Sequence, residues 1–257
     1  MDYEEIILTK EDVKATIMLN RPEKLNAYNR KMEHELKMAI DDIEEDDDIK
    51  VAILTGAGRG FCSGHDLEEV QAGGTSNRER SALRFDLEQS YPPTLIRAMR
   101  KPVIAAVNGV AAGGGLAIAL VCDIRIASED AAFYESHVAR TGIPPGLEVL
   151  LLPRLVGLEK ALEMIFTGEK IDAIEAQRIG LVSKVVPHDR LMEAADELAK
   201  KIADSPLWAL MLSKKAVYQG LGLPIDETMS YITLSRRICA EAGIANMKTP
   251  GQRKRQG

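Results

Sequence analysis

Two glycine-rich segments contain the residues of this chain whose types and spacing could support catalysis through the backbone. The first spans residues 56–67 (GAGRGFCSGHDL) and the second residues 108–116 (NGVAAGGGL), and each follows a short apolar run. If each segment opens a helix, it presents amide groups that have no partner within that helix. Two such amides converging on one point would form an oxyanion hole. The same glycines would equally serve tight turns and close helix–sheet packing.

Neither segment has the spacing of a nucleotide-binding loop. The arrangement Gly56-x-Gly58-x-Gly60 departs from the G-x-G-x-x-G fingerprint of dinucleotide-binding folds. A P-loop is excluded as well, because neither segment is followed by Gly-Lys-Ser or Gly-Lys-Thr. We therefore do not interpret these glycines as a phosphate cradle.

The elements that must position the two segments alternate between strand and helix patterns. Apolar runs at residues 4–9 and 15–19 predict a hairpin, and the apolar spacing over residues 29–43 predicts a helix. Buried strands are predicted at Val51–Leu54, Val103–Val107 and Ile124–Ala127. This rhythm predicts a layered α/β fold with helices packed on a sheet.

The chain changes character after about Gly157. Helical periods recur at residues 161–166, 173–179, 190–203, 207–219 and roughly 225–242. We therefore divide the chain into an α/β core at residues 1–190 and a helical C-terminal region at residues 191–257. Residues 68–90 combine glycines with many charges and predict a mobile loop.

Composition excludes several classes of protein. The net charge of -6 disfavours nucleic acid as the main partner, and no apolar run reaches the roughly 20 residues of a membrane span. The acidic start argues against a secretory or transit peptide. Three scattered cysteines predict reduced thiols in a cytoplasmic protein. We expect no metal site, because the four histidines are far apart in the sequence.

Five motifs follow one another along the chain. They are residues 20–27 (NRPEKLNA), 61–67 (FCSGHDL), 101–109 (KPVIAAVNG) with 113–115 (GGG) and 122–123 (CD), 153–157 (PRLVG), and 173–186. In this order they resemble the crotonase (enoyl-CoA hydratase/isomerase) superfamily. The resemblance runs from about residue 4 to residue 220.

The resemblance implies an α/β fold, a spiral of ββα units, with a C-terminal helical region that builds trimers or hexamers. It implies an acyl-CoA thioester substrate, with coenzyme A part of the substrate and no separate cofactor. The oxyanion donors would be the backbone amides of Ser63 and Gly114. Substrate contacts would come from Lys24, Leu25, Ala27, Ser63, Gly64, His65, Asp66, Leu67 and Gly114.

The sequence departs from the hydratase pattern at both acid/base positions. Hydratases of this superfamily carry two glutamates that handle one water. The first corresponds to Ala117 and the second to His137. Because hydration needs a base for the water and an acid for the α-carbon, standard two-glutamate hydration is not expected.

Three polar side chains are candidates for the missing acid/base role. His137 has an intrinsic pKa near working pH, and the alternative is a loop histidine; Glu135 could orient it if this segment is a strand. Glu148 would point near the acyl pocket, or else be a solvated acid at a helix N-terminus. His65 lies within the oxyanion segment, and its alternative is a packing role against the CoA.

Several functions remain compatible with these residues. An acyl-CoA isomerase or a hydrolase that stabilises an enolate is favoured over hydration, and the general class is a lyase or isomerase of the enoyl-CoA hydratase/isomerase type. A decarboxylase would need the oxyanion hole without the two carboxylates. The rival from another class is a non-catalytic acyl-CoA-binding protein.

Overall fold

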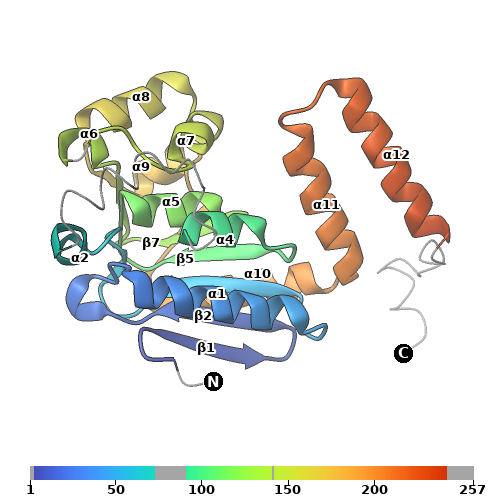
Figure 1. Cartoon of the computed structure of the whole chain (residues 1–257), viewed down its shortest axis with the longest axis horizontal. Coiled ribbons are helices and arrows are strands. Elements are labelled where there is room, and N and C mark those ends of the chain that lie inside the picture. The colour runs from blue at the N-terminus through green and yellow to red at the C-terminus, as the bar shows by residue number, and fades with distance from the viewer. Residues whose placement is uncertain (1–2, 73–90, 141, 242–257) are drawn as a thin grey trace. The chain divides into compact units, whose positions relative to one another are not determined.

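The computed structural model describes residues 3–72, 91–140 and 142–241 (Figure 1). These residues form two compact units, residues 1–205 and 206–257, and each is described by itself. Within the described residues, no helix combines the length and apolarity that crossing a bilayer requires.

A six-stranded sheet forms the centre of the first unit. Its order is β1 (Ile6–Glu11), β2 (Lys14–Leu19), β3 (Val51–Gly56), β5 (Val103–Val107), β7 (Ile124–Ser128) and β10 (Lys184–Val186). The predicted hairpin is confirmed, since β1 and β2 pair antiparallel with Ile6 opposite Leu19. The remaining neighbours pair parallel, and the three predicted buried strands are β3, β5 and β7.

A second sheet of short strands adjoins the ends of the first. Its order is β4 (Gly60–Cys62), β6 (Val110–Ala112), β8 (Ala132–Tyr134) and β9 (Ile171–Asp172). Each of β3, β5 and β7 is followed by one of these short strands and then by a helix. Those helices are α2 (Leu67–Ala72), α5 (Gly114–Val121) and α6 (His137–Arg140). The expected spiral of ββα units is therefore confirmed.

Helices cover both faces of the larger sheet because its parallel strands are apolar on both sides. Val51 and Ile53 of β3 join one core cluster with α10 (Leu191–Ala203). The alternate residues Ala52 and Leu54 join the main core with α1 (Arg30–Glu45), α4 (Pro92–Ala98) and α5. Figure 1 shows α1 lying along the sheet next to β2.

The described part of the first unit contains three further helices and two 3-10 helices, and the first of these three begins with a residue of the site described below. They are α7 (Glu148–Val156), α8 (Leu158–Thr167) and α9 (Ala173–Arg178), with short 3-10 helices η1 (Pro22–Lys24) and η2 (His188–Arg190). Gly157 ends α7 and precedes α8 with a φ of 82°, a conformation that favours glycine.

One sequence prediction needs correction, and part of a second falls outside the described residues. The boundary at residue 190 is wrong, because α10 buries Ala195 and Ala199 against the first sheet and the first unit ends at Ser205. The second unit then contains α11 (Leu207–Gly220) and α12 (Ile225–Glu241). Of the predicted loop at residues 68–90, the start belongs to α2 and residues 73–90 lie outside the described residues.

Candidate active site

The two glycine-rich segments meet at the N-terminus of α5. Gly113 precedes this helix with a φ of 50°, and Gly64 has a φ of 96°. A Cβ atom on Gly64 would lie 3.2 Å from the Gly114 nitrogen, and one on Gly115 would lie 1.9 Å from the Cys62 carbonyl oxygen. The glycines therefore allow the close packing considered from the sequence and bring two backbone segments to one point, and the oxyanion hole stays a prediction.

Ser63 is not available as an oxyanion donor. Its amide donates to the Leu25 carbonyl oxygen at 3.0 Å, and its hydroxyl donates to the Lys24 carbonyl oxygen at 3.1 Å. The prediction that the Ser63 amide faces the thioester is corrected on this ground, since an amide hydrogen already bonded within the protein cannot stabilise a developing charge.

The amide of His65 has the orientation that Ser63 lacks. The neighbouring Asp66 amide donates to the Tyr28 carbonyl oxygen at 2.9 Å, and the Tyr28 amide donates to the Gly64 carbonyl oxygen at 2.9 Å. Because successive amides of an extended chain point to opposite sides, the His65 amide faces away from Tyr28. In the described part of the chain, neither the His65 nor the Gly114 amide has a hydrogen-bond acceptor.

Three ionisable side chains lie together beside the same helix terminus. Glu135 follows β8, His137 begins α6 and Glu148 begins α7. The Glu135 Oε1 atom accepts from the His137 amide at 2.8 Å and also contacts the His137 Nδ1 atom closely. Glu148 Oε1 lies 3.9 Å from Nδ1. His137 and Glu148, proposed from the sequence as alternatives, therefore form one cluster with Glu135.

The cluster is deeply buried. Glu135 and Glu148 are both 0% exposed, so Glu148 is not the solvated acid that was the alternative interpretation. The segment is also not a strand, since Glu135 contacts His137 by capping the first turn of α6. The His137 ring lies against the backbone at the α5 terminus, because a Cβ atom on Gly113 would be 3.6 Å from its Nε2 atom.

The surroundings of the cluster raise the pKa of both Glu148 and His137. Burial raises the pKa of Glu148 to about 7, and the Glu135 charge acts in the same direction, although nearby backbone amides and His137 oppose the shift. Burial alone would lower the pKa of His137, but the hydrogen bond and charge of Glu135 outweigh it and the pKa is raised. Glu148 can therefore exchange a proton near neutral pH.

The cluster could also be considered as a cation site. The donor atoms of Glu135, His137 and Glu148 lie within 4.8 Å of one another. However, the Nδ1 atom that would coordinate an ion is the one in close contact with Glu135. This arrangement favours proton sharing over coordination, and the expectation of no metal stays a prediction.

Aromatic side chains lie next to the cluster, since the charges of Glu148 and His137 act on Tyr91 and His65 respectively. The Tyr28 hydroxyl and His65 Nδ1 share a hydrogen bond of 2.9 Å, and the His65 ring stacks on Tyr91 with centroids 6.0 Å apart. Burial, together with the His137 charge, lowers the pKa of His65 to about 4, so its side chain is neutral at pH 7. Tyr28 and Tyr91 were not singled out from the sequence, because nothing in their spacing relates them to the glycine segments.

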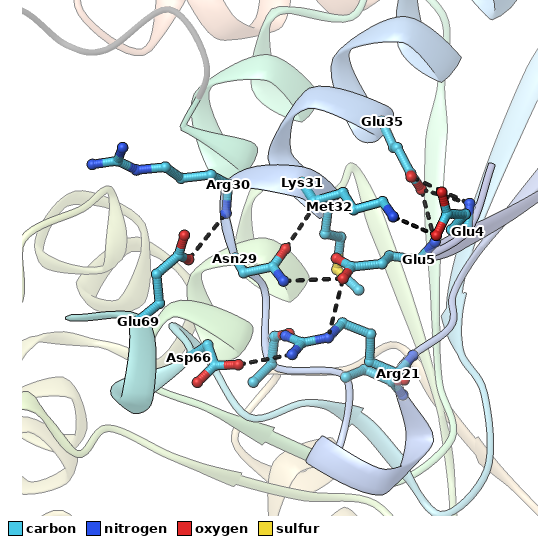
Figure 2. Close-up of polar contacts among 12 residues, drawn as sticks. Glu4, Glu5, Arg21, Asn29, Arg30, Lys31, Met32, Glu35, Asp66 and Glu69 are labelled. Atoms are coloured by element: carbon cyan, nitrogen blue, oxygen red, sulfur yellow. Dashed lines mark hydrogen bonds and ion pairs between the residues drawn. The ribbon is translucent and has the colours of Figure 1, made fainter. Parts of the chain in front are cut away.

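A network of polar contacts among Arg21, Asn29 and Asp66 and their neighbours holds two chain segments in place (Figure 2). Arg21 donates to the Asp66 carboxylate at 2.8 Å and to the Ala27 carbonyl oxygen at 2.6 Å. Asn29 Oδ1 caps α1 by accepting from the Met32 amide at 2.9 Å. Asp66 Oδ1 accepts from the Glu68 amide at 3.1 Å and so caps the N-terminus of α2. These contacts therefore hold the two chain segments next to the His65 amide, which are residues 21–29 and 66–68.

The other residues named from the sequence are distributed around this point. Lys24 pairs with Glu68 at 2.6 Å, Leu25 has a φ of 51° and Ala27 is buried. Leu67 is exposed at the start of α2. Ala117 is 0% exposed within α5. Because its side chain is a methyl group, α5 brings no carboxylate from this position to the cluster.

Comparisons with known proteins agree with this architecture. A family model described as enoyl-CoA hydratase/isomerase matches residues 9–237. The short-chain-enoyl-CoA hydratase of Clostridium acetobutylicum is 41% identical over 90% of this chain and 87% of its own length. The 1,2-epoxyphenylacetyl-CoA isomerase of Escherichia coli is 38% identical over 79% of this chain and 77% of its own length.

Solved structures show the same fold. An enoyl-CoA hydratase from Bacillus anthracis superposes with a TM-score of 0.84 at 34% identity, covering 91% of this chain and 90% of that one. A monofunctional enoyl-CoA isomerase from M. smegmatis gives a TM-score of 0.73 at 35% identity, covering 88% and 98%. The chain therefore belongs to the enoyl-CoA hydratase/isomerase family, within the crotonase superfamily, and is an acyl-CoA enzyme of that type.

Proposed function

We propose that this enzyme removes and returns a proton next to an acyl-CoA carbonyl, in the manner of an isomerase or a hydrolase rather than a two-glutamate hydratase. The thioester oxygen is held by the amides of His65 and Gly114, the latter as expected from the sequence. The CoA part lies along residues 24–27 and 63–67. Removal of the α-proton places negative charge on the thioester oxygen, where two fixed N–H donors stabilise it most.

One observation carries this proposal, namely the position of the Glu135–His137–Glu148 cluster beside the α5 terminus. The His137 ring is adjacent to Gly113, and the next amide along the chain is that of Gly114. A thioester oxygen bound there puts the α-carbon within reach of the cluster. The raised pKa values of His137 and Glu148 suit groups that must both accept and release a proton near pH 7.

The chemistry of the cluster favours proton transfer within the substrate. Ala117 leaves the first of the two hydratase glutamates without a counterpart on α5. A double-bond shift needs a single group that takes the α-proton and returns it to another carbon, so His137 with Glu148 suffices. The relation to a protein named an isomerase, at 38% identity, supports this choice.

Exchange of the α-protons of a saturated acyl-CoA in D2O tests the proposal directly. We expect the wild-type enzyme to exchange these protons, as followed by NMR. Glu148→Gln and His137→Gln should each slow exchange by about 10²–10⁴-fold. Glu159→Gln is the matched control, because Glu159 is an exposed acid in the first turn of α8.

Other results would favour the alternatives. Exchange unaffected by either substitution would remove His137 and Glu148 from the mechanism. Rapid loss of the conjugated absorbance of crotonyl-CoA would show that ordinary hydration persists. Release of CO2 from a malonyl-type thioester would indicate the decarboxylase, and tight CoA binding without any turnover would indicate the non-catalytic binder.

A further inference from the structure

The backbone of Tyr28 is paired with both neighbours of His65. The Tyr28 amide donates to the Gly64 carbonyl oxygen, and the Tyr28 carbonyl oxygen accepts from the Asp66 amide, each at 2.9 Å. Tyr28 and His65 thereby form an isolated parallel bridge. Because Tyr28 is 1% exposed, this bridge holds the His65 peptide from the protein interior, on the side away from the free His65 amide.

The Tyr28 side chain binds His65 a second time. Its hydroxyl and the His65 Nδ1 atom lie 2.9 Å apart, and the two ring centroids are 4.4 Å apart. Burial raises the pKa of Tyr28 well above its usual value, so that the hydroxyl keeps its hydrogen. The backbone and the side chain of Tyr28 therefore fix the same residue of the glycine segment.

The tip of the Tyr28 ring lies against the first residue of α5. A Cβ atom on Gly114 would lie 2.3 Å from the Tyr28 hydroxyl oxygen, 3.0 Å from Cζ and 3.1 Å from Cε1. The ring is thus in contact with the Gly114 backbone, and only a residue without a Cβ atom fits there. The hydroxyl that binds His65 therefore also limits how closely α5 approaches the His65 segment.

We propose that Tyr28 is a positioning residue that sets the separation and direction of the two amides that hold the thioester oxygen. It binds His65 through hydrogen bonds and Gly114 through ring contact, so one rigid side chain relates both donors. This inference rests on the proposed function, because it takes the His65 and Gly114 amides as those donors. Such donors stabilise a developing charge only when both lie within hydrogen-bond distance of it. A small displacement of either amide should therefore slow the reaction more than it weakens binding.

The carbonyl stretching frequency of bound butyryl-CoA, isotopically labelled at the thioester carbonyl, reports on the two amides directly. We expect binding to the wild type to lower this frequency, because hydrogen bonds to the oxygen weaken the C=O bond. Tyr28→Phe removes only the hydroxyl and should lose about half of that lowering or more. In α-proton exchange, its kcat should fall about tenfold, with KM changed by less than about threefold.

Tyr231→Phe is the matched control for the loss of a phenolic hydroxyl. Tyr231 is a half-buried tyrosine on α12. This variant should match the wild type in carbonyl frequency, kcat and KM.

A second substitution tests the contact with α5. Gly114→Ala places a methyl group 2.3 Å from the Tyr28 hydroxyl oxygen and should slow exchange about 10²-fold. Tyr28→Phe removes that atom, and the next closest atom of the ring lies at 3.0 Å. The loss caused by Gly114→Ala should therefore be about fivefold or more smaller in the Tyr28→Phe background. Melting temperatures of the same four proteins should show the same relief.

The outcomes separate this inference from the proposed function. A carbonyl frequency in Tyr28→Phe equal to that of the wild type would overturn the inference alone, and any loss of rate would then reflect a merely structural role. An equal loss from Gly114→Ala in both backgrounds would also overturn it, because Tyr28 would not determine the position of α5. A wild type that neither lowers the carbonyl frequency nor exchanges α-protons would overturn the proposed function and this inference together.

Discussion

Glu148 is a carboxylate with no exposed surface, and its pKa is raised to about 7 chiefly by burial. The folded state thus holds this proton more tightly than the unfolded chain does. The resulting stabilisation is fully present below the unfolded value near 4.5 and is lost as pH rises through about 7. Above that pH the folded enzyme contains a buried charge.

Glu148→Gln should therefore increase stability at alkaline pH while it impairs exchange. At pH 8.5 we expect the variant to exceed the wild type by up to about 3 kcal/mol in the free energy of unfolding. Near pH 5 the difference should be close to zero, because the protonated acid and the amide are similar. Urea titrations at the two pH values measure this effect. A constant difference between variant and wild type would contradict the raised pKa.

Glu135 acts on the reaction through His137 and is a positioning residue. Its hydrogen bond and charge raise the pKa of His137 against the effect of burial. In Glu135→Gln we expect the pKa of His137 to fall, so that the acid limb of the exchange-rate profile moves to lower pH. NMR titration of the His137 ring protons measures the shift.

A matched substitution distinguishes this effect from general damage. Glu169→Gln replaces an exposed acid and should leave the titration of His137 unchanged. If Glu135→Gln lowered the exchange rate equally at every pH, with no change in the titration, a merely structural role for Glu135 would explain the result.

At the scale of elements, the close approach of β4 and α5 is what creates the proposed oxyanion site. Gly115 permits this contact because glycine has no Cβ atom. A Cβ atom there would lie 1.9 Å from the Cys62 carbonyl oxygen and 2.6 Å from the Cys62 carbonyl carbon. Those are backbone atoms, so no side-chain rotation can relieve the overlap. The helix N-terminus and the glycine segment of β4 must separate if any side chain is added.

Gly115→Ala should therefore destabilise the protein by about 3 kcal/mol and abolish acyl-CoA binding. Gly222→Ala is the control, because the nearest atom to its added Cβ lies at 4.0 Å; its effect should stay within about 0.5 kcal/mol. Chemical denaturation and calorimetry provide the two measurements. Near-wild-type stability and binding in Gly115→Ala would contradict the tight contact between β4 and α5.

At the scale of the whole molecule, the C-terminal unit exposes many apolar side chains. No residue of α11 is buried, and Val217 is 63% exposed. On α12, Met229, Leu234 and Ile238 are each more than half exposed. Many exposed large apolar side chains on one pair of helices are typical of an interface between chains. This supports the proposal, first made from the family resemblance, that the helical region joins copies of the chain into trimers or pairs of trimers.

Light scattering coupled to size-exclusion chromatography tests this assembly. We expect the wild type to elute with three or six chain masses of 28.2 kDa. Val217→Glu introduces a charge into the apolar surface and should shift the population toward single chains. Lys215→Glu, an exposed position on the same helix, should keep the wild-type mass. A wild type with the mass of one chain would refute the assembly.

The sequence by itself determined the alternation of strands and helices, because this follows from local periodicity. Its five ordered motifs indicated the family, and the ββα repeat was expected from that resemblance. It also singled out His137 and Glu148 as candidates by their positions among the motifs, and their catalytic role stays a prediction. It did not locate the division between the units, because the small apolar residues of α10 pack equally well in a core or between helices.

The tertiary structure decided the direction and surroundings of the site groups. Whether the amide of Ser63 or of His65 is available depends on pairing with Leu25 and Tyr28, which lie more than thirty residues earlier in the chain. The burial of Glu148 and its partnership with Glu135 and His137 depend on how α6 and α7 fold against α5. Hydrogen-bond direction and burial arise from contacts between distant segments, and local sequence patterns contain neither.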